Sequence, residues 1–250
     1  MEVIYLKKII KILLIILPIV TLIISSYFLY KNLKEDKKQE DIFEEIKEVA
    51  EENSISENNE EQQHDIDMTK LYNTNSDIVA WIRIENTNID YPVMQTKNNP
   101  NYYLRKNFYK QYSYLGTPYL AESCDINASD NFIIYGHHIN NSKMFGELEN
   151  YRKKEYYNKH KFIKFFTLKE NKEYEVIAVF QTVTDTGFKY YNFVNANNER
   201  EFNTFVNQCK KLSFYDTGKI ANYGQKLLTL STCDYSSENA RLVVVAKEIS

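Results

Sequence analysis

The stretch from Lys226 to Lys247 reads KLLTLSTCDYSSENARLVVVAK and holds two apolar runs separated by a polar segment. The runs 226–233 and 241–247 each have the length and composition of a β-strand, and the polar residues between them are typical of a turn. If the two strands pair as a hairpin, Cys233 and Arg241 face each other beside the turn. Ser231 shares a side with Cys233 because side chains alternate along a strand.

A second polar motif lies far upstream, at Tyr135-Gly136-His137-His138. Together with Cys233 and Arg241 it supplies the groups that acyl transfer needs: a thiol nucleophile, an imidazole that carries protons and a fixed positive charge for an oxyanion. Neighbouring histidines at a strand end point to opposite sides, so we expect only one of them to reach the thiol.

Each of these residues also has an ordinary structural interpretation. Cys233 could be a buried apolar side chain, the histidines could bond to the main chain of a turn, and Arg241 could form a surface ion pair. Zinc would need three or four ligands, and the single close pair His137-His138 does not supply them. The Gly218-Lys219 pair lacks the context of a phosphate-binding loop.

Further segments strengthen the case for chemistry because they resemble one protein family. The strand 229–233, the distant Gly-His pair and the arginine on the next strand are similar to sortases, the transpeptidases that attach secreted proteins to Gram-positive cell walls. The class B sortases are resembled by four more segments, in the same order along the chain: 77–84 (DIVAWIRI), 87–93 (TNIDYPV), 131–138 (NFIIYGHH) and 144–148 (MFGEL). The resemblance covers about residues 68–250.

The resemblance implies a catalytic set of Cys233, His137 and Arg241. The family's motif has the catalytic imidazole directly after the glycine, which selects His137 and leaves His138 for packing or a hydrogen bond. The thiolate would cut a C-terminal sorting signal after its threonine, the signal being of an Asn-Pro-x-Thr-Asn or Pro-x-Thr-Gly type. The thioester would then pass to an amine of a peptidoglycan precursor or cross-bridge. We expect no cofactor and no calcium.

Substrate contacts are expected on two segments near the nucleophile. Ser231 lies on the strand of Cys233, and the loop from Thr184 to Tyr191 follows the long strand predicted over 173–184. The candidate substrate-binding residues are Ser231, Thr184, Tyr190 and Tyr191.

The N-terminus contains an uncharged run from Ile12 to Tyr30, long enough to cross a bilayer as a helix. Lysines flank both ends, so charge alone does not fix the orientation. A cleaved signal peptide is disfavoured because the run is long and Ser25-Ser26-Tyr27 is a poor cleavage site. The resemblance implies a catalytic domain outside the cell. The expected order is a cytoplasmic N-terminus (1–11), a transmembrane anchor (12–30), an acidic stalk (31–65) and the catalytic domain (66–250).

The expected stalk has two parts of different composition. Residues 40–52 (EDIFEEIKEVAEE) have Ile42, Ile46 and Val49 at helical spacing and predict a short amphipathic helix. Residues 53–64 are almost without apolar side chains and predict a solvated linker. The acidic run could bind cations or basic partners, but a spacer above an anionic membrane is the simpler interpretation.

Composition favours a β protein. With 21 Tyr and 14 Phe but 6 Gly, the chain favours an aromatic-rich β fold over a glycine-dependent nucleotide-binding one, and its net charge of −3 excludes a basic nucleic-acid signature. Three cysteines without close pairs do not make a disulfide framework, so Cys124 and Cys209 are expected to be incidental thiols.

The pattern predicts a mainly β fold, a closed or nearly closed barrel with peripheral helices. The resemblance implies a sortase-type closed β-barrel of about eight strands. The expected strands are 80–84, 89–93, 119–120, 132–135, 163–168, 173–184, 226–233 and 241–247, and the expected helices are 66–75, 144–151, 153–160 and 199–212. Two rival functions stay open: a thiol peptidase that releases its product to water, and a surface binding module without catalysis.

Overall fold

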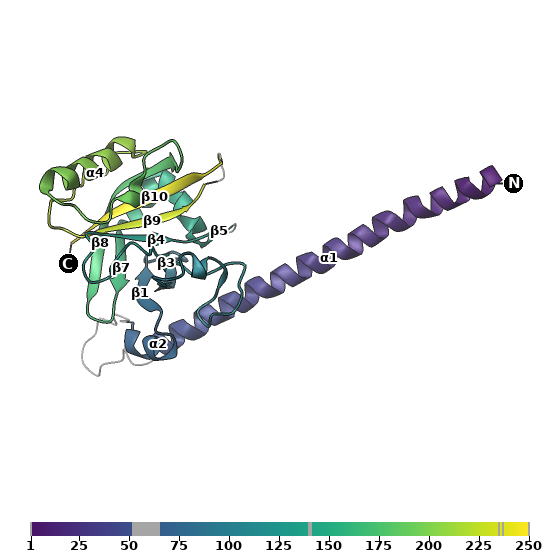
Figure 1. Cartoon of the computed structure of the whole chain (residues 1–250), viewed down its shortest axis with the longest axis horizontal. Coiled ribbons are helices and arrows are strands. Elements are labelled where there is room, and N and C mark those ends of the chain that lie inside the picture. The colour runs from purple at the N-terminus through teal and green to yellow at the C-terminus, as the bar shows by residue number, and fades with distance from the viewer. Residues whose placement is uncertain (1, 52–65, 140–141, 235, 237, 250) are drawn as a thin grey trace. The chain divides into compact units, whose positions relative to one another are not determined.

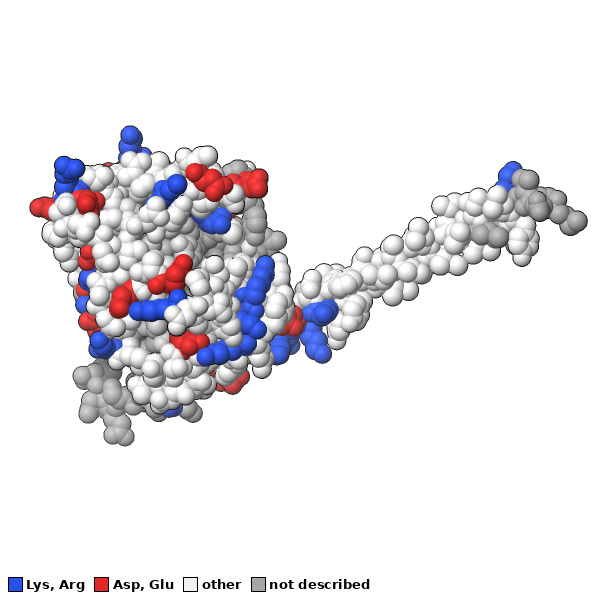
Figure 2. Space-filling model, viewed as in Figure 1, with Lys and Arg blue, Asp and Glu red and all other residues white. Residues whose placement is uncertain are grey.

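The computed structural model describes residues 2–51, 66–139, 142–234, 236 and 238–249. The chain forms two compact units, Met1–Asp41 and Ile42–Ser250. The first unit belongs to one long helix, α1 (Glu2–Glu51), which continues through Pro18. By length and composition α1 is long and apolar enough to cross a membrane. Its large apolar side chains, such as Leu14 and Leu17, are exposed, and Figure 2 shows a long part of this helix without charged residues.

The last turns of α1 belong to the second unit and pack in its core. Ile42, Phe43, Ile46 and Ala50 are buried. The amphipathic helix predicted over 40–52 is present as the end of α1, but residues 42–51 belong to the second unit rather than to a separate stalk, and their apolar stripe is part of its core. The predicted linker 53–64 lies outside the described residues.

Charged residues reinforce this contact. Arg83 Nε lies 2.9 Å from Asp90 Oδ1, and its Nη2 pairs with Glu51. Lys47 Nζ lies 2.8 Å from the other Asp90 oxygen. Because Arg83 is largely buried between two carboxylates, the pairing holds the end of α1 in one position on the second unit.

Eight strands close into a barrel in the order β1-β2-β3-β4-β9-β10-β8-β7 (Figure 1). The pairs β2–β3 and β4–β9 are parallel, and the other pairs are antiparallel. The strands are β1 (Ile78–Arg83), β2 (Asp90–Met94), β3 (Tyr119–Leu120), β4 (Asn131–Tyr135), β7 (Phe162–Phe166), β8 (Asn171–Val183), β9 (Leu227–Cys233) and β10 (Ala240–Glu248). All eight predicted strands are confirmed, with ends displaced by two residues or less.

Helices lie outside the barrel or cover its ends. They are α2 (Met68–Thr74), α3 (Lys154–Lys159), α4 (Glu199–Leu212) and the 3₁₀ turns η1 (Tyr102–Arg105), η2 (Phe145–Arg152) and η3 (Tyr190–Asn192). The predicted α-helix 144–151 is therefore a 3₁₀ helix. A two-stranded sheet of β5 (His138–Ile139) and β6 (Lys143–Met144) was not predicted, because each of its strands has one apolar residue beside a polar one and gives no strand signal.

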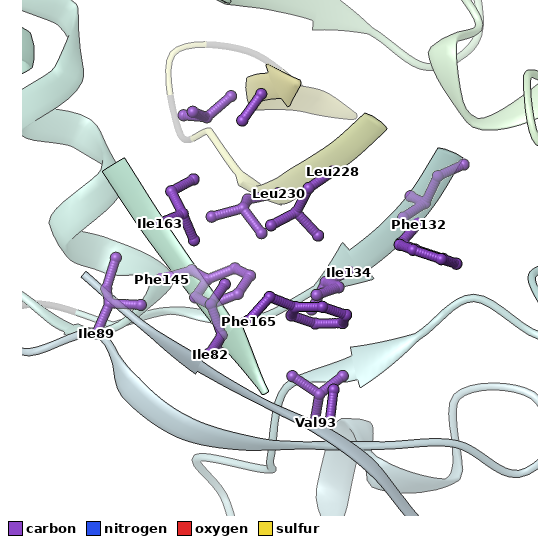
Figure 3. Close-up of a cluster of buried hydrophobic side chains, with 14 of the residues drawn as sticks. Ile82, Ile89, Val93, Phe132, Ile134, Phe145, Ile163, Phe165, Leu228 and Leu230 are labelled. Atoms are coloured by element: carbon purple, nitrogen blue, oxygen red, sulfur yellow. The ribbon is translucent and has the colours of Figure 1, made fainter. Parts of the chain in front are cut away.

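The barrel interior is filled by side chains from facing strands. Figure 3 shows Leu228 and Leu230 of β9 pointing toward Ile134 of β4 and Phe165 of β7. All four are almost completely buried. Since side chains alternate along a strand, Thr229, Ser231 and Cys233 lie on the outer face of β9.

Candidate active site

Cys233 lies in a three-residue row across the outer face of the barrel. It pairs with Arg241 on β10, and Arg241 pairs on its other side with Thr182 of β8. The predicted hairpin of Cys233 and Arg241 is thus confirmed. Directly opposite residues have Cβ atoms about 4.5–5.5 Å apart, so the guanidinium can reach any group bound at the thiol. Arg241 Nη1 donates to the carbonyl of Ala240 at 2.9 Å, and its other N–H groups have no acceptor among the residues that the structure describes.

The next row holds Ser231, which pairs with Tyr135 of β4. The hydroxyls of Ser231 and Tyr190 lie 2.5 Å apart, and both residues are about 1% exposed. Burial raises the pKa of Tyr190 to about 12, although the bond to Ser231 and the charge of Arg241 oppose the rise. The two residues therefore support the barrel surface beside Cys233 from beneath. Their role in binding substrate stays a prediction.

Thr184 and Tyr191 also meet each other. Tyr191 donates from its hydroxyl to the carbonyl of Thr184 at 3.1 Å, and the Thr184 amide donates to Asn239 O at 3.1 Å. These bonds tie the segment after β8 to the loop before β10. Both residues are half-buried, which leaves part of each side chain accessible.

A glycine shapes the same segment. The Phe188 amide donates to Thr182 Oγ1 at 2.9 Å, which closes the turn after β8. A Cβ on Gly187 would lie 2.4 Å from that oxygen, so no larger residue fits. This turn holds the segment 184–191 in place beside the row of Cys233 and Arg241.

His137 leaves β4 at the same edge of the barrel. Tyr135 and Ser231 form the last paired row of the parallel strands β4 and β9, and His137 and Cys233 each follow by two residues. His137 Nε2 lies 2.8 Å from the carbonyl oxygen of Leu104. A carbonyl only accepts, so Nε2 carries a proton and Nδ1 is the nitrogen that can take up or release another. Burial lowers the pKa of His137, and the nearby charge of Arg105 lowers it further.

His138 is the first residue of β5 and has a different partner from His137. Its Nδ1 lies 3.0 Å from the carbonyl oxygen of Cys233. This is a hydrogen bond of the kind expected for His138, and it holds the main chain at the nucleophile.

Glycine is required at position 136 for a steric reason. A Cβ there would lie 2.6 Å from the ring of Phe145, which is fully buried. The backbone of Gly136 has no positive φ. Glycine is needed because the first residue of η2 packs directly on the chain before His137.

Sequence reasoning missed the ion pair of Arg152 and Asp234. Arg152 contacts Asp234 through Nη2, and its Nη1 donates to Gln181 Oε1 at 3.2 Å. Burial opposes ionisation of Asp234, but bonds from Ser236 and the charge of Arg152 outweigh it and lower its pKa. A local sequence pattern could not predict this pair, because its two residues are 82 positions apart. It anchors the residue that directly follows Cys233.

The other two thiols have different surroundings. Cys124 and Cys209 are buried, and burial raises the pKa of both, whereas Cys233 is half-exposed. Within the described residues, no group of three or more His, Cys, Asp and Glu side chains could hold a metal ion. The arrangement as a whole offers a thiol, an imidazole and a guanidinium on one outer edge of the barrel.

Comparisons with known proteins agree with this arrangement. The Sortase domain matches residues 82–249. Sortase B of Staphylococcus aureus (strain NCTC 8325 / PS 47) is 30% identical over 237 residues, 94% of each chain.

Solved structures give the same result. A Staphylococcus aureus sortase B–substrate complex is similar with a TM-score of 0.74 and 28% identity, covering 87% of this chain and 99% of that one. Clostridium perfringens sortase B is similar with a TM-score of 0.67 and 30% identity, covering 73% and 100%. A matching domain over most of the barrel, together with relatives that align along nearly the whole chain, shows that this protein belongs to the sortase family and, within it, to class B.

Proposed function

We propose that the protein is a cysteine transpeptidase that cuts a C-terminal sorting signal after threonine and transfers the acyl group to a peptidoglycan amine. The pairing of Cys233 with Arg241 on the outer face of β9 and β10 carries this proposal. It puts a nucleophile and a fixed cation side by side where a peptide can reach both. Membership of the sortase family supports transpeptidation as the general reaction.

In the first half-reaction, the Cys233 thiolate attacks the carbonyl carbon after the threonine. Arg241 stabilises the oxyanion, because its planar fork of N–H donors stays charged throughout. The peptide C–N bond then breaks, and protonated His137 gives its proton to the departing amine. A lowered pKa makes the His137 imidazolium a stronger acid for this step. The product is a thioester on Cys233.

In the second half-reaction, an amine of a peptidoglycan precursor or cross-bridge attacks the thioester. His137, now neutral, takes the proton of this amine, and the Cys233 thiolate leaves. The cycle is balanced without a cofactor, because one amide bond is broken and one is formed.

The sorting signal is of an Asn-Pro-x-Thr-Asn or Pro-x-Thr-Gly type. Thr184 and Tyr191 contact the signal directly from the segment that follows β8, where both side chains are half-buried. Ser231 and Tyr190 are about 1% exposed, so they act on the signal from beneath, through the barrel surface that their hydroxyl pair supports.

The apolar part of α1 serves as an uncleaved anchor at residues 12–30. Residues 1–11 stay in the cytoplasm, 31–41 begin the stalk, and the barrel works outside the cell membrane. The exposed apolar side chains of α1 support the assignment of an anchor.

The test uses the full-length protein in detergent with a peptide that contains Asn-Pro-Gln-Thr-Asn and with triglycine as the amine. Mass spectrometry should show a thioester on the enzyme and a Thr–Gly ligation product. Cys233→Ala should remove both, whereas Cys124→Ala and Cys209→Ala should keep them. Ligation by Cys233→Ala would refute the assignment, and a product released only to water would identify a thiol peptidase instead.

A further inference from the structure

The connection between β2 and β3 contains a small, well-bonded hairpin. Lys106 and Tyr112 form an antiparallel bridge. The Ser113 amide donates to Arg105 O at 3.1 Å, and the Asn107 amide donates to Gln111 O at 2.9 Å. We call residues 102–114 the basic hairpin.

The basic hairpin is anchored to the barrel unit through buried side chains. Phe108 is fully buried, and its carbonyl accepts a bond from Asn75 Nδ2 at 2.6 Å. Tyr103 is also buried and donates to Asp77 at 2.8 Å. The shape of the hairpin is therefore set before any ligand arrives, which lowers the entropy cost of binding.

Its outer surface combines exposed tyrosines with cations. Tyr112 is 63% exposed and Tyr114 is 52% exposed. The Arg105 guanidinium lies 5.1 Å from the Tyr114 ring centre, and Lys106 Nζ lies 5.8 Å from that of Tyr102. Tyrosine and arginine are the residue types that dominate binding energy at interfaces.

The charge of this region is opposite to that of the whole protein. Residues 91–121 contain four basic residues and no acidic one, although the chain has a net charge of −3. Lys97 pairs with Asp125 and Lys110 with Asp77. Arg105 and Lys106 have no carboxylate partner among the residues that the structure describes. Figure 2 shows Lys and Arg side chains gathered on the side of the barrel where this connection lies in Figure 1.

The basic hairpin adjoins the candidate active site. Leu104, which holds His137 through its carbonyl, is directly followed by Arg105. The Arg105 charge is also close enough to lower the pKa of His137. A ligand on the hairpin thus lies beside the imidazole that must deprotonate the incoming amine.

We propose that the basic hairpin binds the acceptor, a peptidoglycan strand with free carboxylates on its peptide stem. Arg105 and Lys106 pair with these carboxylates, and Tyr112 and Tyr114 pack on the strand. This inference rests on the proposed function. The acceptor is favoured over the sorting signal because the signal's Asn, Pro and Thr residues offer no negative charge, whereas the acceptor carries both the amine and the anions.

The experiment separates the two half-reactions in the full-length protein in detergent micelles. The thioester is first formed with the Asn-Pro-Gln-Thr-Asn peptide, and its loss is then followed against the concentration of a disaccharide-tetrapeptide with free carboxylates. The same acceptor with amidated carboxylates is the second probe. The test variant is Lys106→Gln with Tyr112→Ser, and Lys97→Gln is the matched control because Lys97 is already paired. Arg105 is left unchanged since it also acts on His137.

We expect the double variant to raise the half-saturating acceptor concentration about five-fold, the scale of one surface charge and one aromatic contact. Thioester formation should be unchanged, and Lys97→Gln should behave as wild type. Amidation of the acceptor should raise its half-saturating concentration for the wild type. Most of the difference between the wild type and the double variant should then disappear.

An unchanged acceptor dependence in the double variant would overturn the inference alone. A wild type that forms no thioester would overturn the proposed function and the inference together. The measurement is repeated in vesicles of neutral and of anionic phospholipid. A loss confined to the anionic vesicles would overturn the inference by assigning the hairpin to the lipid surface.

Discussion

The two faces of β9 carry different kinds of side chain. On the inner face, Leu228 and Leu230 are fully buried and contact other apolar side chains across the barrel (Figure 3). On the outer face, Ser231 is bonded to Tyr190, and Cys233 lies opposite Arg241. The inner face stabilises the fold by size and shape, and the outer face presents reactive groups. Alternate residues of one strand thus serve different purposes: those that point inward stabilise the barrel, and those that point outward present reactive groups.

The inner face has one exception near the catalytic end. Thr232 is buried, and its hydroxyl has no partner among the residues that the structure describes.

The largest expected effect tests which imidazole serves the outer face. His137→Ala should reduce turnover by about 10²–10⁴, because general acid–base catalysis is lost. His138→Ala should cost much less, since His138 Nδ1 bonds to the Cys233 carbonyl and the proton transfer is assigned to His137. Steady-state transpeptidation measures both, with circular dichroism as the folding control. The reverse ranking would show that His138 is the proton carrier.

The next effect separates charge from geometry on the outer face. Arg241→Lys keeps the positive charge but loses the planar fork, so turnover should fall by about 10²–10³, as for other lost oxyanion donors. Thermal melting should be nearly unchanged because Arg241 is only half-buried. Near-normal turnover in Arg241→Lys would mean that positive potential suffices and that backbone amides hold the oxyanion.

The smallest effect on chemistry is expected on the inner face. Leu230→Ala should lower the free energy of unfolding by about 2–5 kcal/mol, because it leaves a cavity in the barrel core. The turnover of the molecules that remain folded should stay close to wild type. Urea unfolding and active-site titration measure the two quantities. A large loss of turnover per folded molecule would show that the two faces are not independent.

The sequence predicted the strands well because each is a run of apolar or alternating residues between polar segments. The helix α4 was predicted with its observed ends, since Phe202, Phe205, Val206 and Cys209 recur at helical spacing. Cys233 and Arg241 were predicted to face each other because a hairpin fixes its own register. These are features that local pattern determines.

Features that depend on distant contacts were harder to predict. The Arg152–Asp234 pair and the Tyr190–Ser231 pair join segments far apart in the sequence. Tyr190 was expected at the substrate but lies beneath the surface, because a tyrosine in a polar segment gives no sign of its burial. The segment 42–51 has a clear helical stripe, yet periodicity alone does not tell which surface covers it.

The close approach of Phe145 to Gly136 has a consequence for how relatives of this protein can vary. The ring lies where a Cβ on residue 136 would have to be, so the two positions cannot change independently. Any homologue that replaces this glycine needs a smaller side chain at position 145 or a displaced η2. In an alignment, the residue before His137 and the first residue of η2 should therefore vary together or not at all. The same pair gives protein engineers a constraint to respect when they exchange loops between sortases.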